Sequence, residues 1–429
     1  MVPVIRALEA STLLRPWVVS TGQHPGLVDS VLALGGIRPD VDLRVTTKSR
    51  SLNGLFAGIL AGLEEALIER FGPPDSVITS GRKSTYPGVA LVHGDTTSAA
   101  AAALSAFHLR MPVAHVEAGL RTHTTFSPFP EELNRQLISR IASFHLAPTS
   151  VAEENLIREG IAYREIFVTG NTAIDAILWS AELHAPYEAE VLSDLDDDPR
   201  AVVVITAHRR ENWGEGVERI GAAIAELATL RPDVRFVLAL HPNPAVAVPL
   251  RDALEGYPNV DLVPPMGYAS FSRLLRRARF AISDSGGIQE EAPAVGTPVL
   301  VTRETTERGE AVSAGTVRLV GTDPATIVRN ALELIDDEAA YLEMVHSQNP
   351  FGDGHAADRI VKSIEHLAFG TAKPARFGSG YSREVVLRAA GFSEGLLEAA
   401  RAMPGRGAIP PEPLLPPESV ATPIVHLGS

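Results

Sequence analysis

Short apolar runs alternate with longer stretches of mixed apolar and polar residues along most of the chain. The run at 280–283, Phe-Ala-Ile-Ser, ends at Asp284-Ser285-Gly286-Gly287, and a short helical pattern and a second apolar run at 298–301 follow it. Glycines at such a point permit a close backbone approach that a Cβ would forbid. The pattern predicts a turn from a strand into a helix, where free N–H groups and the helix dipole favour an anion.

Two carboxylates, Glu290 and Glu291, lie in the predicted helix after this turn. A carboxylate would be an odd neighbour for a phosphate alone, but carboxylates accept hydrogen bonds from ribose hydroxyls in nucleotide sites of α/β folds. We therefore interpret 280–301 as a site for an anion beside a polyol. The alternative is a structural turn with solvated glutamates, because short glycine motifs also occur without a ligand.

The same alternation predicts two sheet-forming regions separated by an acidic loop at 188–200. Strands that alternate with helices predict parallel, doubly wound sheets. The first region has predicted helices at 2–10, 24–34, 52–71, 97–107 and 131–143 and strands at 16–20, 89–93, 113–116 and 166–169, with a surface loop at 73–88. The second has predicted strands at 202–205, 236–240, 260–263, 280–283, 298–301 and 317–320, and then a helix at 356–367.

Three carboxylates lie where predicted strands of the first region end or the next helix begins. Asp95 follows the strand at 89–93, Glu117 follows the strand at 113–116, and Glu131 begins a helix. Open α/β sheets bind ligands at the carboxyl ends of their strands, so we expect the three to share a pocket. Mutual repulsion and burial would raise some of their pKa values into the range of a general acid or base. The alternatives are a helix cap for Asp95 and an ordinary helix charge for Glu131.

Cationic residues follow two predicted strands of the second region. His208 and Arg209 follow the strand at 202–205, and Arg308 follows a later strand. Arginine binds diphosphate through paired hydrogen bonds and histidine can protonate a leaving group, so these residues predict a diphosphate site. The alternative is a solvated basic turn paired with Glu211.

Composition narrows the classes of function. The 429 residues are enough for two domains, and a net charge of −14 disfavours nucleic-acid or membrane-surface partners. The absence of cysteine excludes thiol chemistry and favours the cytoplasm, and no apolar run approaches the roughly 20 residues that span a bilayer. We predict no cofactor and no metal, because His115 and His241 lack suitably spaced partners and no metal or nucleotide signature motif is found.

Seven motifs together resemble the non-hydrolysing UDP-N-acetylglucosamine 2-epimerases, over about residues 1–368. They are HGDTT from His93, HVEAGLRT from His115, SPFPEELNRQL from Ser127, VTGNTAIDA from Val168, AHRREN from Ala207, SDSGGIQEEAP from Ser283 and TERGEAVSAGTVRLVGTD from Thr306. The resemblance implies a GT-B fold, two Rossmann-like domains with a cleft between them, and the interconversion of UDP-N-acetylglucosamine and UDP-N-acetylmannosamine through a glycal intermediate.

The resemblance also assigns residues. It implies that Asp95, Glu117 and Glu131 are the acid/base carboxylates and that His208 lies near the β-phosphate, without deciding which carboxylate is the base. Uracil is expected at Phe271 and the Met266 backbone, and ribose at Glu291. The full set predicted to bind UDP is Arg209, Met266, Phe271, Ser285, Gly286, Gly287, Glu291 and Arg308.

The predicted N-terminal domain is 1–172, completed by a helix at 352–369, and the predicted UDP-binding domain is 173–351. An extension at 370–429 is expected to be helical at 383–403 and then a disordered, proline-rich tail. The resemblance further implies a UDP-sugar substrate, a homodimer, and a role in cell-envelope polysaccharide biosynthesis.

The chain departs from the family pattern at its beginning. The family opens with a strand and a Gly-Thr-Arg-Pro-Glu loop whose Arg, with a nearby Lys, reaches the ligand, whereas Met1 aligns just beyond that loop. We therefore expect the first domain to lack its central strand, and the chain to start too late and be poorly soluble or nearly inactive. The alternative is that another segment, such as 73–88 or the tail after Gly370, fills the vacant position. Gly309 replaces a usual proline. Gly26 and Ala57 replace polar residues of the regulatory UDP-sugar site, although Gln23 and His24 remain.

Three other functions stay open. A hydrolysing epimerase would release free N-acetylmannosamine and UDP from the same residues. A catalytically inactive UDP-sugar binder would bind UDP without turnover. A GT-B glycosyltransferase is weaker, because it would not need three carboxylates on successive elements of the first domain.

Overall fold

The computed structural model describes residues 1–23, 25–45, 51–73, 88–126, 128–378 and 422–428. The chain divides into two compact units, which are Met1–Asp175 with Gly354–Ser429 (unit 1) and Ala176–Asp353 (unit 2). Helix α7, Thr172–Ala181, contains the first division. The expected divisions after residues 172 and 351 lie three and two residues from those in the structure.

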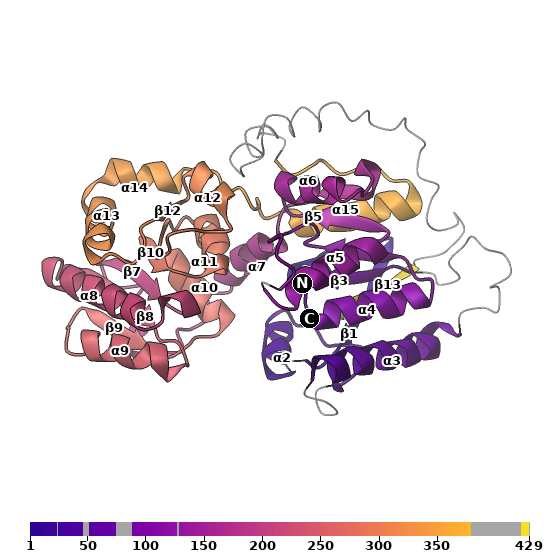
Figure 1. The fold of residues 1–429 in the computed structure, drawn as a ribbon, viewed down its shortest axis with the longest axis horizontal. Coiled ribbons are helices and arrows are strands. Elements are labelled where there is room, and N and C mark those ends of the chain that lie inside the picture. Colours follow the sequence, from indigo (N-terminus) through magenta and orange to yellow (C-terminus); the bar gives the residue numbers. More distant parts are fainter. Residues whose placement is uncertain (24, 46–50, 74–87, 127, 379–421, 429) are drawn as a thin grey trace. The chain divides into compact units, whose positions relative to one another are not determined.

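Unit 1 is built on a parallel sheet of seven strands in the order β2-β1-β13-β3-β4-β5-β6 (Figure 1). Its strands are β1 Leu14–Ser20, β2 Val41–Asp42, β3 Ala90–His93, β4 Val113–Val116, β5 Phe144–Ala147, β6 Ile166–Val168 and β13 Thr422–Gly428. Its helices are α1 Val2–Ala10, α2 Pro25–Leu34, α3 Leu52–Phe71, α4 Thr97–His108, α5 Glu131–Ile141, α6 Ser150–Arg158 and α15 Ala356–Phe369.

Helices cover both faces of this sheet because successive side chains of a strand point to opposite faces. Ala90 and Val92 of β3 pack in one core with α3 and α4, whereas Leu91 packs in another with α1 and α15. Each of these three side chains is fully buried. A strand buried on both faces reads as a continuous apolar run, which is why β3 could be predicted.

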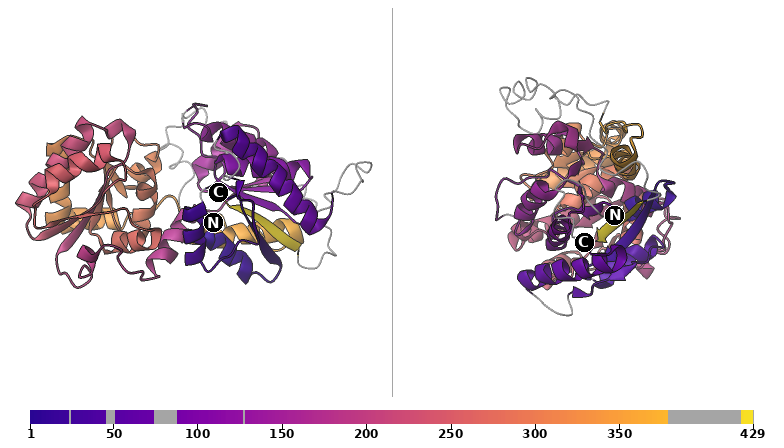
Figure 2. Two further views of the ribbon diagram at one scale, coloured as in Figure 1. Left: turned by 90° about the horizontal axis from the view of Figure 1, so that it is seen from below. Right: turned by 90° about the vertical axis from the view of Figure 1, so that its right-hand side faces the viewer.

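The expectation that unit 1 lacks its central strand is wrong. Strand β13 lies between β1 and β3 and is parallel to both (Figures 1 and 2). The expected disorder of the tail is also wrong at Thr422–Gly428, because this segment pairs with strands that are remote in sequence. The predicted helix at 383–403 and most of the loop at 73–88 lie outside the described residues.

Unit 2 is built on a parallel sheet in the order β12-β11-β10-β7-β8-β9. Its strands are β7 Ala201–Thr206, β8 Val234–Ala239, β9 Val260–Val263, β10 Phe280–Ser283, β11 Val299–Val301 and β12 Val317–Leu319. Its helices are α8 Glu215–Leu230, α9 Pro244–Leu254, α10 Tyr268–Arg277, α11 Gly286–Glu291, α12 Gly309–Ala314, α13 Pro324–Asp336 and α14 Glu338–Val345.

The core of unit 2 joins β7, β8 and β10 to α8, α9 and α13, with Phe236 and Phe280 fully buried. The predicted α/β class with two doubly wound parallel sheets is confirmed. In each sheet the strands end at the same edge, and that edge carries the candidate chemistry described next.

Candidate functional site

Asp95 lies just beyond β3 and is held by α5. Arg135 donates to its carboxylate from Nε at 2.9 Å and approaches it with Nη2 at 2.6 Å. The side-chain amide of Asn134 donates to the Asp95 carbonyl at 2.8 Å. Thr96, and not Asp95, caps α4, since its hydroxyl accepts from Ala99 N. The capping alternative for Asp95 therefore loses its basis, and the carboxylate has a different role.

Glu117 follows β4 with a strained backbone. Its φ is 64°, a left-handed conformation that is uncommon for a residue with a side chain and that often marks functional positions. Its Oε2 lies 3.5 Å from His93 Nε2. A Cβ at Gly94, itself at φ 71°, would come within 3.3 Å of the same oxygen. Glu117 is thus directed towards the loop that carries Asp95.

His115 of β4 holds the loop after β3 through a hydrogen bond. Its Nε2 donates to the Gly94 carbonyl at 2.8 Å, and the side chain is completely buried. Burial lowers the pKa of His115 to about 4, so the ring is neutral at pH 7. The structure therefore gives His115 a positioning contact within the core.

Glu131 begins α5, one helical turn before Arg135. The next residue, Glu132, is fully buried and accepts hydrogen bonds from Thr122 N at 3.0 Å and Arg135 Nη1 at 2.9 Å. Burial alone would raise the pKa of Glu132, but these hydrogen bonds hold it below the ordinary value. Arg135 therefore bridges the carboxylates of Asp95 and Glu132. Of the predicted acid/base residues, Asp95 and Glu117 lie at neighbouring strand ends, and Glu131 shares α5 with Arg135.

In unit 2 a buried carboxylate organises the cationic loop after β7. Asp284 follows β10, is fully buried, and accepts from His208 N at 3.0 Å and Arg209 N at 3.0 Å. The Asn212 side chain donates to it at 2.9 Å and also to the Thr302 carbonyl at 3.1 Å. These bonds to a charged acceptor fix the loop between two neighbouring strands. Burial lowers the pKa of His208, although the charge of Asp284 opposes the shift.

Two arginines meet at the glycine turn. A Cβ at Gly286 would come within 2.8 Å of the Arg308 guanidinium and 3.1 Å of Arg209 Nη2, so a side chain there would displace the two arginines. Arg308 pairs with Glu290 at 2.9 Å and with Glu307, and Arg209 lies 3.4 Å from Glu307. Burial would raise the pKa of Glu307, but a backbone hydrogen bond and the neighbouring Arg308 and Arg303 lower it to about 2. The arrangement concentrates fixed charge around the turn.

The rest of the predicted UDP set lies on α10 and α11. Ser285 precedes α11, and Gly287 has open space, since a Cβ there would meet only the Ser285 hydroxyl at 4.0 Å. Tyr268 donates to Glu291 at 3.4 Å. Burial and the adjacent Glu290 raise the pKa of Glu291 to about 8, so the free carboxyl is mostly protonated at pH 7. Hydroxyl groups that donate hydrogen bonds to a carboxylate stabilise its ionised form, so a bound diol would lower this pKa and favour loss of the proton.

The predicted uracil contacts lie at the start of α10. Met266 precedes this helix and accepts a weak hydrogen bond from Ser270, and Phe271 lies in its first turn. Glu188 accepts from Gly267 N at 2.8 Å, which holds the turn between them. Both predicted residues are partly exposed, as a ligand contact requires.

Several residues that organise these groups were not predicted. They are Asn134, Arg135, Glu132, Asn212, Tyr268, Asp284 and Glu307. Asp284 carried a usable signal, because it directly follows a buried strand. The Glu132 contact of Arg135 could have been inferred from the three-residue spacing on α5, but its contact with Asp95 could not, because Asp95 comes from another element.

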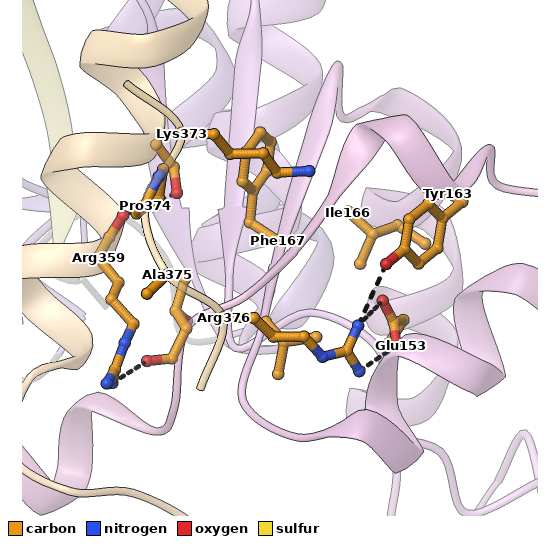
Figure 3. A pocket seen from close by; sticks show the side chains of 12 residues that line it. Glu153, Tyr163, Ile166, Phe167, Arg359, Lys373, Pro374, Ala375 and Arg376 are labelled. Atoms are coloured by element: carbon orange, nitrogen blue, oxygen red, sulfur yellow. Dashed lines mark hydrogen bonds and ion pairs between the residues drawn. The ribbon is translucent and has the colours of Figure 1, made fainter. Parts of the chain in front are cut away.

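A separate pocket of unit 1 lies where the segment after α15 crosses α6 and β6 (Figure 3). Arg376 binds both carboxylate oxygens of Glu153, at 2.8 Å and 2.6 Å, and Phe377 N donates to the Val168 carbonyl at 2.9 Å. The ammonium of Lys373 lies 5.1 Å from the centre of the Phe167 ring. These contacts tie the segment to unit 1, and we assign the pocket a structural role.

Among the described residues, no group of three His, Cys, Asp or Glu side chains could hold a metal ion. His241 accepts from Asn243 N at 3.0 Å, a contact within a turn. Over the same part of the chain, no helix is both long and apolar enough to cross a membrane.

Sequence comparison identifies the relatives of this chain. A family model described as UDP-N-acetylglucosamine 2-epimerase matches residues 6–365. The UDP-N-acetylglucosamine 2-epimerase of Yersinia pestis is 43% identical over 373 residues, which cover 85% of this chain and 95% of that protein. The enzyme of the same name from Escherichia coli K12 is 42% identical over 377 residues, with the same coverage.

Solved structures give the same result. The Neisseria meningitidis UDP-GlcNAc 2-epimerase bound to UDP-GlcNAc has a TM-score of 0.71 and 41% identity, over 85% of this chain and 95% of that one. The S. aureus MnaA structure with UDP has a TM-score of 0.74 and 37% identity, over 88% and 96% of the respective chains. These likenesses confirm the predicted GT-B type fold with two Rossmann-like units.

Proposed function

Because this chain belongs to the UDP-N-acetylglucosamine 2-epimerase family of isomerases, we propose that it interconverts UDP-N-acetylglucosamine and UDP-N-acetylmannosamine. A base removes the proton from C2 of the sugar while the C1–O bond breaks and UDP departs with the bonding electrons. The glycal that results is protonated at C2 on the opposite face, and UDP adds back at C1. No oxidant, reductant or cofactor is needed.

The observation that carries this proposal is Glu117, which keeps a strained left-handed backbone at the end of β4 and points to the loop of Asp95. A strained backbone conformation persists only where the surrounding structure holds it in place, and such residues are concentrated at functional sites. Asp95, Glu117 and Glu131 are the proposed carboxylates for the two C2 proton transfers. Arg135 fixes the position of Asp95, and His115 fixes the Gly94 carbonyl.

The residues of unit 2 hold UDP in this proposal. Arg209 and Arg308 bind the diphosphate next to Gly286, where no side chain obstructs the approach. His208 supports the departing β-phosphate, and Glu291 accepts from the ribose hydroxyls. Met266 and Phe271 contact uracil, while Ser285 and Gly287 complete the turn. Preorganised donors of this kind stabilise a charge that develops in the transition state.

The test is proton NMR of UDP-N-acetylglucosamine incubated with the protein in deuterated water. We expect the H2 signal to disappear as deuterium enters at C2, together with new signals of UDP-N-acetylmannosamine and no free sugar. Free N-acetylmannosamine with UDP would identify the hydrolysing reaction. UDP binding without loss of H2 would identify an inactive binder, and either result would contradict the proposal.

The proposed setting follows the family resemblance. We infer a cytoplasmic homodimer that supplies UDP-N-acetylmannosamine for cell-envelope polysaccharides. Light scattering on the purified chain tests the dimer, with a monomer mass as the contradicting result.

A further inference from the structure

Strand β13 fills the centre of the unit 1 sheet, and it lies outside the range that the family model matches. Its seven residues pair with Leu14–Ser20 of β1, from Thr422 with Leu14 to Gly428 with Ser20. On the other side Val425–Leu427 pair with Ala90–Val92 of β3. No function assigned by similarity therefore includes this segment.

The two neighbours depend on β13 for their hydrogen bonds. On its other side β1 pairs, among the described strands, with the short β2 through Val19 and Ser20, and Asp40 N also donates to the Val18 carbonyl. Without β13, the backbone groups of the alternate β1 residues that face it, and one row of groups on β3, would lose their partners. Each unpaired group costs about 1 to 3 kcal/mol, and a few of them rival a whole domain's stability of roughly 5 to 15 kcal/mol.

The order of strands gives β13 a defined place. Unit 2 has the doubly wound order in which the first strand, β7, lies between the second, β8, and the fourth, β10. Unit 1 has the same order when β13 is taken as the first strand, because β1 and β2 lie on one side and β3, β4, β5 and β6 on the other. In such sheets the first strand lies at the topological switch point, where ligands bind.

The carboxyl end of β13 reaches the candidate site. Leu427 pairs with Val92, one residue before His93, and Gly428 pairs with Ser20, one residue before Thr21. Thr21 donates to Ser98 of α4 at 3.3 Å, Ser98 in turn donates to Gln23, and β13 itself contacts α4. The carboxyl end of β13 therefore lies next to the starts of two loops, the one after β1 and the one after β3 that carries Asp95.

We propose that residues 422–428 are a strand that the chain supplies from its own C-terminal segment, and that its insertion between β1 and β3 assembles the carboxylate edge of unit 1. The groove between β1 and β3 is a binding site for an extended peptide, and its occupant is this segment of the same chain. The proposal rests on the proposed function only where turnover is the readout. Unit 2, which has its own central strand, is independent of β13.

Hydrogen exchange of the unmodified full chain, followed by mass spectrometry, is the first test. We expect the amides of 424–428 to exchange as slowly as those of Val113–Val116 in β4. Exchange of 422–428 at the rate of a free peptide, with β1 and β3 protected, would overturn the proposal. This result does not depend on enzyme activity, so it still decides the matter if the proposed function fails.

A matched pair of proline variants is the second test. Val425→Pro removes an N–H group within β13, whereas Val420→Pro makes the same change two residues before the strand. We expect Val425→Pro to abolish protection in β1 and β3, lower turnover at least 100-fold and leave UDP binding and protection of β7 unchanged. Val420→Pro should match the unmodified chain. Equal protection and turnover in the two variants would overturn the proposal, and if Val425→Pro does not fold, the first test decides alone.

Coexpression of an Asp95→Asn chain with a Val425→Pro chain separates the chain's own strand from a strand of a second copy. We expect each chain alone to turn over substrate at least about 100-fold more slowly than the unmodified chain, and the mixture to show no more than this residual turnover. Recovered turnover would mean that the intact strand of one chain completes the sheet of the other, which would overturn the assignment to the same chain.

Discussion

The sheets of the two units share one spatial order of strands but not one order along the chain. In unit 2 the central strand, β7, is the first strand of the unit, whereas in unit 1 the central strand, β13, is the last of the described strands. Each central strand is parallel to its two neighbours, and the loops that carry the polar groups follow the carboxyl ends of these paired strands. A doubly wound sheet thus requires a strand at its centre, and that strand can come either from the beginning of the unit or from its C-terminal segment.

The polar groups at the two edges also differ in kind. Unit 1 gathers carboxylates around Arg135, whereas unit 2 gathers Arg209, Arg308 and His208 around the buried Asp284. In the proposed function, unit 1 would carry out the proton transfers and unit 2 would bind the diphosphate. Substitutions in the two units should therefore affect different measurements.

The largest effect is expected from the carboxylates of unit 1. Asp95→Asn, Glu117→Gln and Glu131→Gln should each lower kcat about 100-fold or more, because each removes a proposed acid or base. Steady-state kinetics with UDP-N-acetylglucosamine measures the loss, and calorimetry should show unchanged UDP affinity. Glu64→Gln, an exposed position on α3, is the control. If two of the three retain turnover within a few fold, the carboxylate assignment is wrong.

The arginines of unit 2 should show the opposite pattern. Arg308→Ala should weaken UDP binding about 10- to 100-fold, because it removes a charged donor and leaves Glu290 and Glu307 without that partner. Calorimetric titration with UDP is the measurement. Arg219→Ala removes an exposed arginine of α8 and should leave the affinity unchanged. Equal affinities for the two variants would contradict the placement of the diphosphate.

A moderate, pH-dependent effect on stability is expected at Glu291. The folded pKa is raised from 4.5 to about 8, so the folded state binds this proton more tightly than the unfolded state, and stability falls as pH rises from about 4.5 to about 8. Glu291→Gln carries no such proton and should raise the Tm at pH 8 by more than at pH 5. The exposed Glu343→Gln is the control. An increase in Tm of the same size at both pH values would mean that the pKa of Glu291 is not raised in the folded protein.

The smallest expected effect is a difference in Tm between two Glu117 variants. It separates the cost of the left-handed backbone from the role of the carboxylate. Glu117→Gly and Glu117→Gln both remove the carboxylate, but only glycine adopts a φ of 64° without a steric cost. Glycine gains about 1 to 2 kcal/mol from the relieved conformation and loses roughly 0.5 to 1 kcal/mol to chain entropy. Thermal melting should place the glycine variant at or slightly above the glutamine variant. A clearly lower Tm for glycine would show that the backbone there is not strained.

Local patterns predicted most strands and helices of both units, because strands buried on both faces appear as apolar runs. Strand β5, which has only four residues and begins three residues after the end of α5, was missed. Its His145 is fully buried and donates to the Ser139 carbonyl at 3.1 Å. Strand β13 was missed because its partners, β1 and β3, are more than 300 residues away in sequence.

The candidate site could be predicted where one strand end carries the chemistry, as at Asp95, Glu117 and His208. It could not be predicted where the contact joins separate elements. Asp284 holds a loop 75 residues earlier, and Arg135 joins Asp95 to the buried Glu132. Sequence spacing carries no record of the Asp284 and Asp95 contacts, because they form only when strands take their order in the sheet, whereas Glu132 and Arg135 are three residues apart on α5.

The place of β13 also bears on how the protein is made. A ribosome releases the strands of unit 2 by residue 319, whereas the unit 1 sheet cannot be complete until residue 428 has emerged. Domains usually fold in order from the N-terminus during synthesis. Here we expect the reverse, which limited proteolysis of stalled nascent chains can measure. Strands β1 and β3 would then stay exposed to chaperones and to aggregation until residue 428 has been synthesised.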